Sequence, residues 1–316
     1  MTPHRHEPPI GFVRYFDVDS FLETMINNKH SIQELVSNSL EYVPCPLCGS
    51  GDSLFIHRPK SGLPFCIHRC KSCGFDYLSP RLREAVMHHH YQAETYFDGD
   101  GYQNYAEQEL ALRATFRRLL KRLHGLGHTG GRLLEIGCGY GFLLAEAAPY
   151  FSFRCGTDYS AKAVAQARKH ADEVLLGGQD AVQNSTSCFD CVIANHVIEH
   201  VYDPLAFVSG LLEMLRPGGS LLLSTPDAGS WWRRLMGPRW PSYKLPEHIL
   251  YFNTVNLAGL VRRAGAQEPL AIPYPHAFPL TVVAAKFGWK LGPRWSRNSV
   301  WLPGTTTAVL SKRRLG

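Results

Sequence analysis

The sequence predicts an α/β protein built around a doubly wound, mostly parallel sheet, with a small cysteine-bearing module in front of it. Three observations carry this prediction. Short apolar runs alternate with helical patterns between residues 132 and 226, an order typical of strand–helix–strand units. One of these runs is followed at once by alternating glycines. Two C-x2-C pairs precede them all, and 316 residues suffice for one large domain with an appendage.

The composition is that of a globular protein, with 45% hydrophobic and 19% charged residues. The net charge of +6 permits an acidic substrate but is weaker than the basic footprint of nucleic-acid-binding domains. No run of eighteen apolar residues occurs, and the first residues lack the apolar stretch of a signal peptide. We therefore expect a cytoplasmic protein without a membrane span. The nine cysteines agree with this, because four have the spacing of metal ligands and the other five are scattered without a disulfide pattern.

The first module contains two cysteine knuckles, "CPLCGS" and "CKSCGF", separated by twenty-one residues. Two such turns direct four thiolates at one point, and tetrahedral sulfur coordination suits Zn²⁺. We expect a closed, structural site in a zinc ribbon, with "LFIHRP" and "FDYLSP" as short strands. Cys66 and His68 lie in the same loop and are the competing ligands. The predicted zinc ligands are Cys45, Cys48, Cys70 and Cys73.

The centre of the chain begins with "RLLEIGCGYGFLLAEAAP" from Arg132, which predicts a buried strand, a glycine-rich turn and a helix ended by Pro149. Such a turn places backbone N–H groups at a helix N-terminus, close to a bound ligand. The spacing G-x-G-x-G departs from the dinucleotide-binding pattern, because Phe142 occupies the third glycine position of that pattern.

The following segments continue the alternation. A second strand ends at Asp158, where an acidic side chain can bind a ribose diol, and Ser160 can cap the next helix. A third strand leads to Asp180. The run "CFDCVIAN" predicts a fourth strand, a helix then begins at Asp203-Pro204, and "SLLLSTP" predicts a fifth strand. Ligands of such sheets bind outside the carboxyl ends of the strands.

Together, "LLEIGCGYG", "DYS", "FDCVIANHVIEHV", "LRPGGSLLLSTP" and "PEHILYF" resemble the class I S-adenosylmethionine-dependent methyltransferases. The resemblance covers about residues 132–266 and is strongest to the branch of the ubiquinone-type O-methyltransferases. It implies S-adenosylmethionine as cofactor, S-adenosylhomocysteine as product, and O-, C- or N-methylation of a small molecule of the natural-product, quinone-like or sugar-linked kind. By motif position it assigns cofactor contacts to Glu135, near the methionine amino group, and to Gly137, Cys138, Gly139, Gly141, Asp158, Tyr159, Asp180, Ala181 and Asn195.

The string "HVIEH" raises a separate question, because H-x-x-E-H is the signature of the inverzincin peptidases. A peptidase needs both histidines on one continuous helix, whereas His196 should lie on a loop at the end of a strand. We therefore predict no peptidase. Some ubiquinone-type O-methyltransferases use E-x-x-E-H at this place for a divalent metal, so the resemblance leaves open a second metal site at His196, Glu199 and His200. The alternative is that Glu199 and His200 only orient the loop by hydrogen bonds.

Methyl transfer is chiefly a positioning problem, with a base needed if the nucleophile carries a proton. The candidate catalytic residues are His196, His200 and His248. For His248 a hydrogen-bonded structural role is the alternative.

Two segments rich in Trp, Pro and Arg, residues 229–248 and 273–301, lack a helix or strand period and are expected as loops on the substrate side. Their arginines suit a planar or anionic substrate, or cover a lid packed by aromatic residues. They are Arg233, Arg234, Arg239 and Arg294. Tyr96, Tyr102 and Tyr105 are lid candidates, and the threonine-rich run at 305–314 predicts a last edge strand.

The expected organisation is therefore an N-terminal helical or irregular segment (1–42), a zinc ribbon (43–80), a helical cap or lid (81–128) and the methyltransferase domain (129–316). Two rival functions share these features. One is an RNA methyltransferase that recognises its substrate through the ribbon, and the other is a non-catalytic scaffold that binds the cofactor. The charge and the aromatic segments favour a small-molecule substrate over a nucleic acid, and a homodimer is left open.

Overall fold

The computed structural model describes residues 39–58, 65–92, 108–182, 184, 187–274, 276–286, 288, 289, 291, 292, 295 and 297–315. Most of the expected N-terminal segment, the lid candidates Tyr96, Tyr102 and Tyr105, and Arg294 lie outside these residues. None of the described helices is long and apolar enough to cross a membrane.

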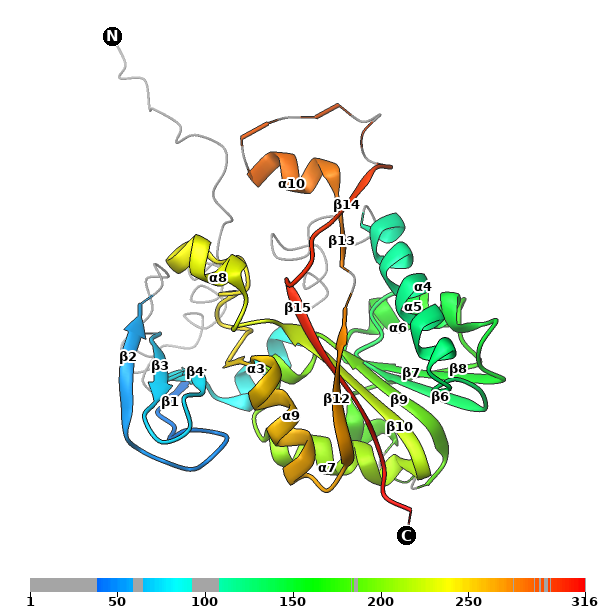
Figure 1. Ribbon diagram of the computed structural model, residues 1–316, viewed down its shortest axis with the longest axis horizontal. Coiled ribbons are helices and arrows are strands. Elements are labelled where there is room, and N and C mark those ends of the chain that lie inside the picture. The colour runs from blue at the N-terminus through cyan, green and yellow to red at the C-terminus, as the bar shows by residue number, and fades with distance from the viewer. Residues whose placement is uncertain are drawn as a thin grey trace, which may run out of the picture.

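The core of the molecule is a seven-stranded sheet in the order β12-β15-β10-β9-β6-β7-β8 (Figure 1). The five strands from β10 to β8 are parallel, as predicted, and β15 and β12 add two antiparallel pairings. The chain starts in the middle at β6 and later crosses to β9, so the strand order reverses between these two strands. The strands are β6 (Arg132–Ile136), β7 (Phe153–Asp158), β8 (Glu173–Leu176), β9 (Phe189–Asn195), β10 (Leu215–Pro226), β12 (Gln267–Pro273) and β15 (Thr306–Lys312).

Helices cover both faces of this sheet, which confirms the doubly wound class. On one face α4, α5 and α6 pack with the sheet in one hydrophobic core. On the other face α7 and α9 pack in a second core, which extends into the ribbon. The predicted caps are present, since the side chains of Ser160 and Asp203 accept backbone N–H groups of the helices that follow them. The helices are α4 (Glu109–Gly125), α5 (Phe142–Ala147), α6 (Ala161–Ala167), α7 (Pro204–Met214) and α9 (Thr254–Arg263).

The prediction that the threonine-rich run forms an edge strand is wrong. β15 pairs with β10 on one side and β12 on the other, and all its residues except Lys312 are buried. Its hydroxyl groups are satisfied internally: Ser311 Oγ donates to the Gln267 carbonyl at 2.7 Å, and the hydroxyls of Thr307 and Thr254 lie 2.7 Å apart. Threonine therefore occurs here as a β-branched interior residue, and the edge is β12.

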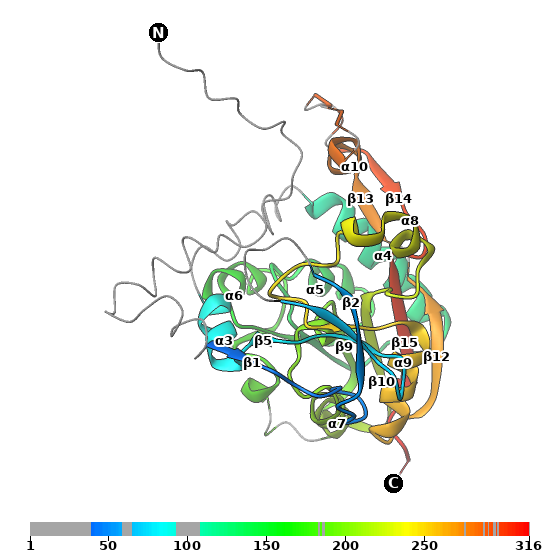
Figure 2. The same ribbon diagram turned by 90° about the vertical axis from the view of Figure 1, so that its left-hand side faces the viewer.

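The front module is an antiparallel sheet of β2 (Ser53–His57), β3 (Ile67–Cys70) and β4 (Asp76–Leu78) (Figure 1), to which β11 (Leu250–Tyr251) adds a fourth strand. The strand before this sheet, β1 (Leu40–Glu41), pairs with the strand after it, β5 (Arg81–Leu82), and helix α3 (Glu84–Gln92) follows β5 (Figure 2). Because β11 lies in the chain between β10 and β12 of the large sheet, the ribbon sheet is completed by the methyltransferase part of the chain. Phe75 and Phe252 pack across this junction with ring centroids 4.9 Å apart.

The two segments expected as loops contain short regular elements. The first holds α8 (Trp231–Met236) and a 3₁₀ turn (Gly237–Arg239); the second holds β13 (Ala277–Pro279), α10 (Leu280–Lys286) and β14 (Ser299–Trp301). The expectation of aperiodic loops is wrong for these stretches. Helices and strands of three to seven residues contain too few repeats for a periodic signal.

Candidate active site

The glycine turn follows β6 and requires glycine at two positions for steric reasons. A Cβ atom on Gly137 would lie 2.6 Å from Val197 Cγ2, and one on Gly141 would lie 2.9 Å from Ala167 Cα. Both residues also have positive φ, at 70° and 78°. The turn is thus closed against the loop after β9 and against α6, and Gly139 points its N–H at the end of β7.

The end of β7 receives that N–H group. Asp158 Oδ2 accepts from Gly139 N at 2.9 Å, and Oδ1 accepts from Ser160 N at 2.9 Å. Burial raises the pKa of Asp158, and the two backbone N–H groups oppose this shift. Each carboxylate oxygen retains acceptor capacity, so Asp158 is oriented at the sheet edge and can accept further hydrogen bonds.

Beside Asp158, Tyr159 and Asp180 converge from two strands. The Tyr159 hydroxyl donates to Asp180 Oδ1 at 3.2 Å, and Gly178 N donates to the same oxygen at 3.0 Å. Asp180 and Ala181 lie in a 3₁₀ turn (Gln179–Val182) after β8. His88 of α3 packs on the Tyr159 ring with centroids 5.1 Å apart.

Glu135, in β6, is 3% exposed, and its Oε2 atom has no hydrogen-bond partner among the described residues. Burial raises its pKa well above the usual range; the charge of Asp158 adds to this shift, and the polar side chain of Asn195 opposes it. Asn195 Nδ2 is likewise buried without a partner in the described part of the chain. An orphaned buried polar atom costs about 1–3 kcal/mol, so both atoms fit a site that a polar ligand completes.

The H-x-x-E-H string spans the loop after β9 and only a single 3₁₀ turn (Ile198–His200). His196 precedes this turn, has a φ of 53°, and donates its backbone N–H to Ser224 O at 2.9 Å. The two histidines therefore do not share a continuous helix, and the peptidase arrangement is absent from this loop. His196 Nδ1 lies 3.3 Å from Glu199 Oε1, while its Nε2 atom is buried without a partner among the residues described.

Glu199 also belongs to a cluster of possible metal ligands. One ligand atom each from Glu199, His200 and His248 falls within 4.8 Å of the others, and His196 is not in this group. The Nδ1 atoms of His200 and His248 lie 3.0 and 2.9 Å from the carbonyl oxygens of Glu247 and Ser242. Both Nδ1 atoms therefore carry a proton, which leaves each Nε2 with a free lone pair, the arrangement common in metal-binding histidines.

The charges of this cluster are strongly coupled. Burial lowers the pKa of His248 to about 3 and also lowers that of His200. For Glu199, burial opposes ionisation, but the close approach and charge of His196 and the other imidazoles lower the pKa to about 2. Glu199 is 1% exposed, and neither of its carboxylate oxygens has a hydrogen-bond partner among the described residues.

Tyr274 and His276 were missed by the sequence analysis. The Tyr274 hydroxyl donates to Asn195 Oδ1 at 3.4 Å, and the His276 ring lies 5.7 Å from that of His196. His276 stacks on Phe278 at 4.1 Å, and its Nδ1 is 3.1 Å from Thr306 Oγ1. Both residues belong to the segment 273–301. The only sequence feature that could have indicated their role was the expectation that this segment lies on the substrate side.

The four predicted zinc ligands come together in the ribbon, with one sulfur from each within 4.8 Å of the others. The Sγ atoms of Cys45 and Cys73 lie 3.5 Å apart, as do those of Cys48 and Cys70. The competing ligands lie elsewhere: Arg58 Nε donates to Cys66 Sγ at 3.4 Å, and His68 Nδ1 is 3.2 Å from Ser53 Oγ. Four converging thiols fit tetrahedral Zn²⁺.

Comparison with known proteins agrees with this geometry. A family model described as a methyltransferase domain matches residues 102–267, slightly more than half of the chain. The ubiquinone biosynthesis O-methyltransferase of Cereibacter sphaeroides (strain KD131) is 31% identical over 174 residues, which cover 51% of this chain and 69% of that protein. The mitochondrial enzyme of that name from Schizosaccharomyces pombe is 31% identical over 173 residues, covering 52% of this chain and 61% of the relative.

Among solved structures, the magnesium protoporphyrin IX methyltransferase of Synechocystis, with bound S-adenosylhomocysteine, has a TM-score of 0.49 at 15% identity and covers 73% of this chain and 100% of that chain. The chain belongs to the methyltransferase domain family. More particularly, it is a class I S-adenosylmethionine-dependent methyltransferase, which confirms the predicted fold, enzyme class and cofactor.

Proposed function

We propose that this enzyme methylates a small-molecule acceptor, with a hydroxyl oxygen as the favoured methyl acceptor. The two curated relatives named above are O-methyltransferases of ubiquinone biosynthesis. The observation that carries the proposal is His196, whose Nδ1 faces a buried carboxylate while Nε2 has no partner among the described residues.

Cofactor binding is assigned to the carboxyl ends of β6, β7 and β8. When bound, S-adenosylmethionine supplies a methyl group on a positively charged sulfur, which is already a good electrophile. In this assignment Glu135 accepts the methionine ammonium, and Asp158 accepts the ribose hydroxyls. The glycine turn lets the backbone approach the cofactor closely. The remaining contacts are Gly137, Cys138, Gly139, Gly141, Tyr159, Asp180, Ala181 and Asn195.

Proton removal is assigned to His196. Glu199, fixed in the core, orients the imidazole through Nδ1, so Nε2 faces the acceptor and takes its proton as the new bond to oxygen forms. Tyr274 and His276 border the same space and limit the access of water. In this assignment His200 and His248 do not touch the acceptor, and they hold the loop through their carbonyl contacts.

The metal assignments complete the proposal. The four ribbon cysteines hold a structural Zn²⁺, which closes the module without taking part in the reaction. The second candidate set is Glu199, His200 and His248, with His196 of the predicted set replaced by His248. Glu199 cannot both orient His196 as a base and hold a metal with His200 and His248, so removal of metal distinguishes the two roles. If His196 acts as the base, activity should survive chelation of exchangeable divalent ions.

We also place the enzyme in the cytoplasm, acting on no nucleic acid. The test uses S-adenosylmethionine with a labelled methyl group and separate pools of cell RNA and small-molecule extract. Label in the small-molecule pool is expected. Label in RNA alone would overturn the assigned acceptor class and make the ribbon a recognition module for RNA.

A further inference from the structure

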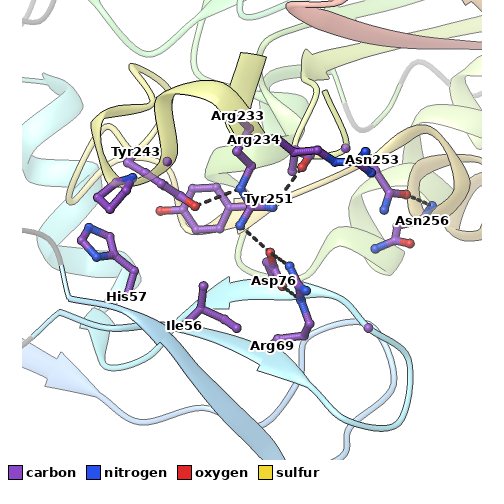
Figure 3. A pocket seen from close by; sticks show the side chains of 15 residues that line it. Ile56, His57, Arg69, Asp76, Arg233, Arg234, Tyr243, Tyr251, Asn253 and Asn256 are labelled. Atoms are coloured by element: carbon purple, nitrogen blue, oxygen red, sulfur yellow. Dashed lines mark hydrogen bonds and ion pairs between the residues drawn. The ribbon is translucent and has the colours of Figure 1, made fainter. Parts of the chain in front are cut away.

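A cavity of about 640 Å³ lies at the junction between the ribbon and the methyltransferase sheet, away from the glycine turn (Figure 3). Its walls come from β2, β3 and β4 on one side, and from α8 and the segment from Tyr243 to Asn256 on the other. Neither the cofactor assignment nor the acceptor assignment uses it. The residues that the argument uses are His57, Arg69, Asp76, Arg233, Arg234 and Asn256.

Asp76 forms the floor of the cavity and is shared by two arginines. Arg69 Nε and NH2 bind its two oxygens at 2.7 and 2.9 Å, and Arg233 NH2 binds Oδ2 at 2.5 Å. Arg233 also donates to the Tyr243 hydroxyl at 2.9 Å and to the Ala228 carbonyl at 3.0 Å. One carboxylate thus faces two guanidinium groups, so the floor carries one uncompensated positive charge.

Arg234 adds a second uncompensated charge. It is exposed and lines the same cavity, and no hydrogen bond or ion pair of its side chain occurs among the described residues. Asp227, which precedes the lining residue Ala228, does not itself line the cavity, and its Oδ1 accepts the N–H of Gly229 at 2.8 Å.

The rim of the cavity is rich in hydrogen-bond donors. Asn253 caps α9 by accepting Asn256 N at 2.9 Å, which leaves its side-chain NH₂ group as a donor. The amide of Asn256 lines the cavity beside it, and the positive end of the ten-residue helix α9 adds to the field of the arginines. A group with several oxygens and a negative charge suits such a rim better than a neutral or cationic group does.

We propose that this junction cavity binds a phosphate or diphosphate group. This group has two possible sources. One is an anionic part of the methyl acceptor, an alternative that rests on the proposed function; the other is a free anion that stabilises the contact between the ribbon and the sheet. The cavity is linked to the active site, because the Tyr251 hydroxyl in its wall donates to the carbonyl of His248 at 2.8 Å. His57 and Tyr243, with ring centroids 5.8 Å apart, supply an aromatic wall beside the charged floor.

The first test is calorimetric titration of the zinc-loaded full chain with pyrophosphate at low ionic strength. We expect saturable binding that Arg234→Gln weakens about tenfold, the usual contribution of one charge-assisted contact. Arg262→Gln is the matched control, because Arg262 is exposed at the opposite end of α9. Equal affinity of the two variants, or no saturable binding by the wild type, overturns the site.

Asn256→Asp gives a second test that does not depend on a loss of folding. An acidic residue in the first turn of a helix stabilises that helix, so the variant should keep its thermal stability, yet it should repel pyrophosphate and weaken binding at least tenfold. Unchanged affinity contradicts the proposal.

A competition experiment distinguishes the sources. With the acceptor found in the labelled pool, competitive inhibition by pyrophosphate identifies an anionic part of the acceptor, whereas binding without inhibition identifies a free anion; both outcomes support the site. Calorimetry measures binding without turnover. The test of the anion site therefore remains valid even if the proposed function is wrong.

Discussion

The part of the site that we assign to the cofactor (the cofactor edge) and the part that we assign to the methyl acceptor (the acceptor edge) are built in different ways. At the cofactor edge, the ends of β6, β7 and β8 hold one another through backbone N–H groups and short side chains, as in the contact of Gly139 with Asp158. At the acceptor edge, side chains from distant segments meet: His196 lies against His276, and His200 against His248 and Tyr91. The first edge is fixed by a local motif, and the second by the packing of the ribbon, the loop after β9 and the C-terminal segment.

This difference has a functional consequence. A cofactor common to many enzymes needs the same backbone contacts in each, whereas the acceptor changes from enzyme to enzyme and is read by side chains on variable segments. Changes at the cofactor edge should therefore affect binding of S-adenosylmethionine, and changes at the acceptor edge should affect turnover.

The largest effect is expected from Cys45→Ser. Loss of one thiolate removes the zinc site, and the core around Phe75 and Phe252 joins the ribbon to the large sheet, so both parts lose stability. We expect loss of bound zinc and a fall in Tm on the order of 10 °C, measured by metal analysis and calorimetry. Cys66→Ser, which alters a buried thiol outside the cluster, is the control and should retain its zinc.

The next effect is expected from His196→Gln. Removing the base should lower kcat by about 10²–10⁴-fold, while the affinity for S-adenosylhomocysteine stays within about twofold because the cofactor edge is untouched. His124→Gln, on the exposed face of α4, is the matched control. If kcat is unchanged in His196→Gln but collapses in His248→Gln with loss of a bound divalent ion, the metal assignment replaces the base assignment.

A smaller effect is expected from alanine at two glycines, Gly141 and Gly127, a comparison that distinguishes backbone strain from steric crowding in the glycine turn. Gly141 and Gly127 have nearly equal φ values of 78° and 76°, but only the first would place a Cβ against another residue, at 2.9 Å from Ala167 Cα. Both alanine variants should lose about 1–2 kcal/mol of unfolding free energy from the left-handed backbone. Gly141→Ala should lose further stability by pushing α6 away, and denaturant titration of the pair measures the excess. Equal losses would mean that the contact with α6 is not tight.

The parts of the structure that followed from the sequence are those encoded locally. The five parallel strands, the caps at Ser160 and Asp203, and the four cysteines were predicted, because each depends on residues close together in the chain. What could not be predicted depends on contacts across long separations. The addition of β11 to the ribbon sheet and the interior place of β15 are examples.

The site follows the same rule. The convergence of Glu135, Asp158 and Asp180 on one edge follows from strand order, which the sequence indicates. The approach of His248 to Glu199 and of His276 to His196 depends on how short irregular segments fold back. Neither segment has a hydrophobic periodicity from which its position could be predicted. Of the two α8 arginines that were expected to contact substrate, Arg233 instead binds the ribbon's Asp76, because the ribbon packs against that helix.

The most direct measurement is calorimetric titration of S-adenosylhomocysteine into the wild type and two aspartate variants. Asp158→Ala removes the carboxylate held at the end of β7, while Asp172→Ala removes one paired with Arg154 at the start of β8, outside the assigned site. We predict that Asp158→Ala weakens binding by about ten- to a hundredfold, the value of one or two charge-assisted hydrogen bonds, and that Asp172→Ala leaves it unchanged. Equal affinity of both variants and the wild type would contradict the assignment of the cofactor site.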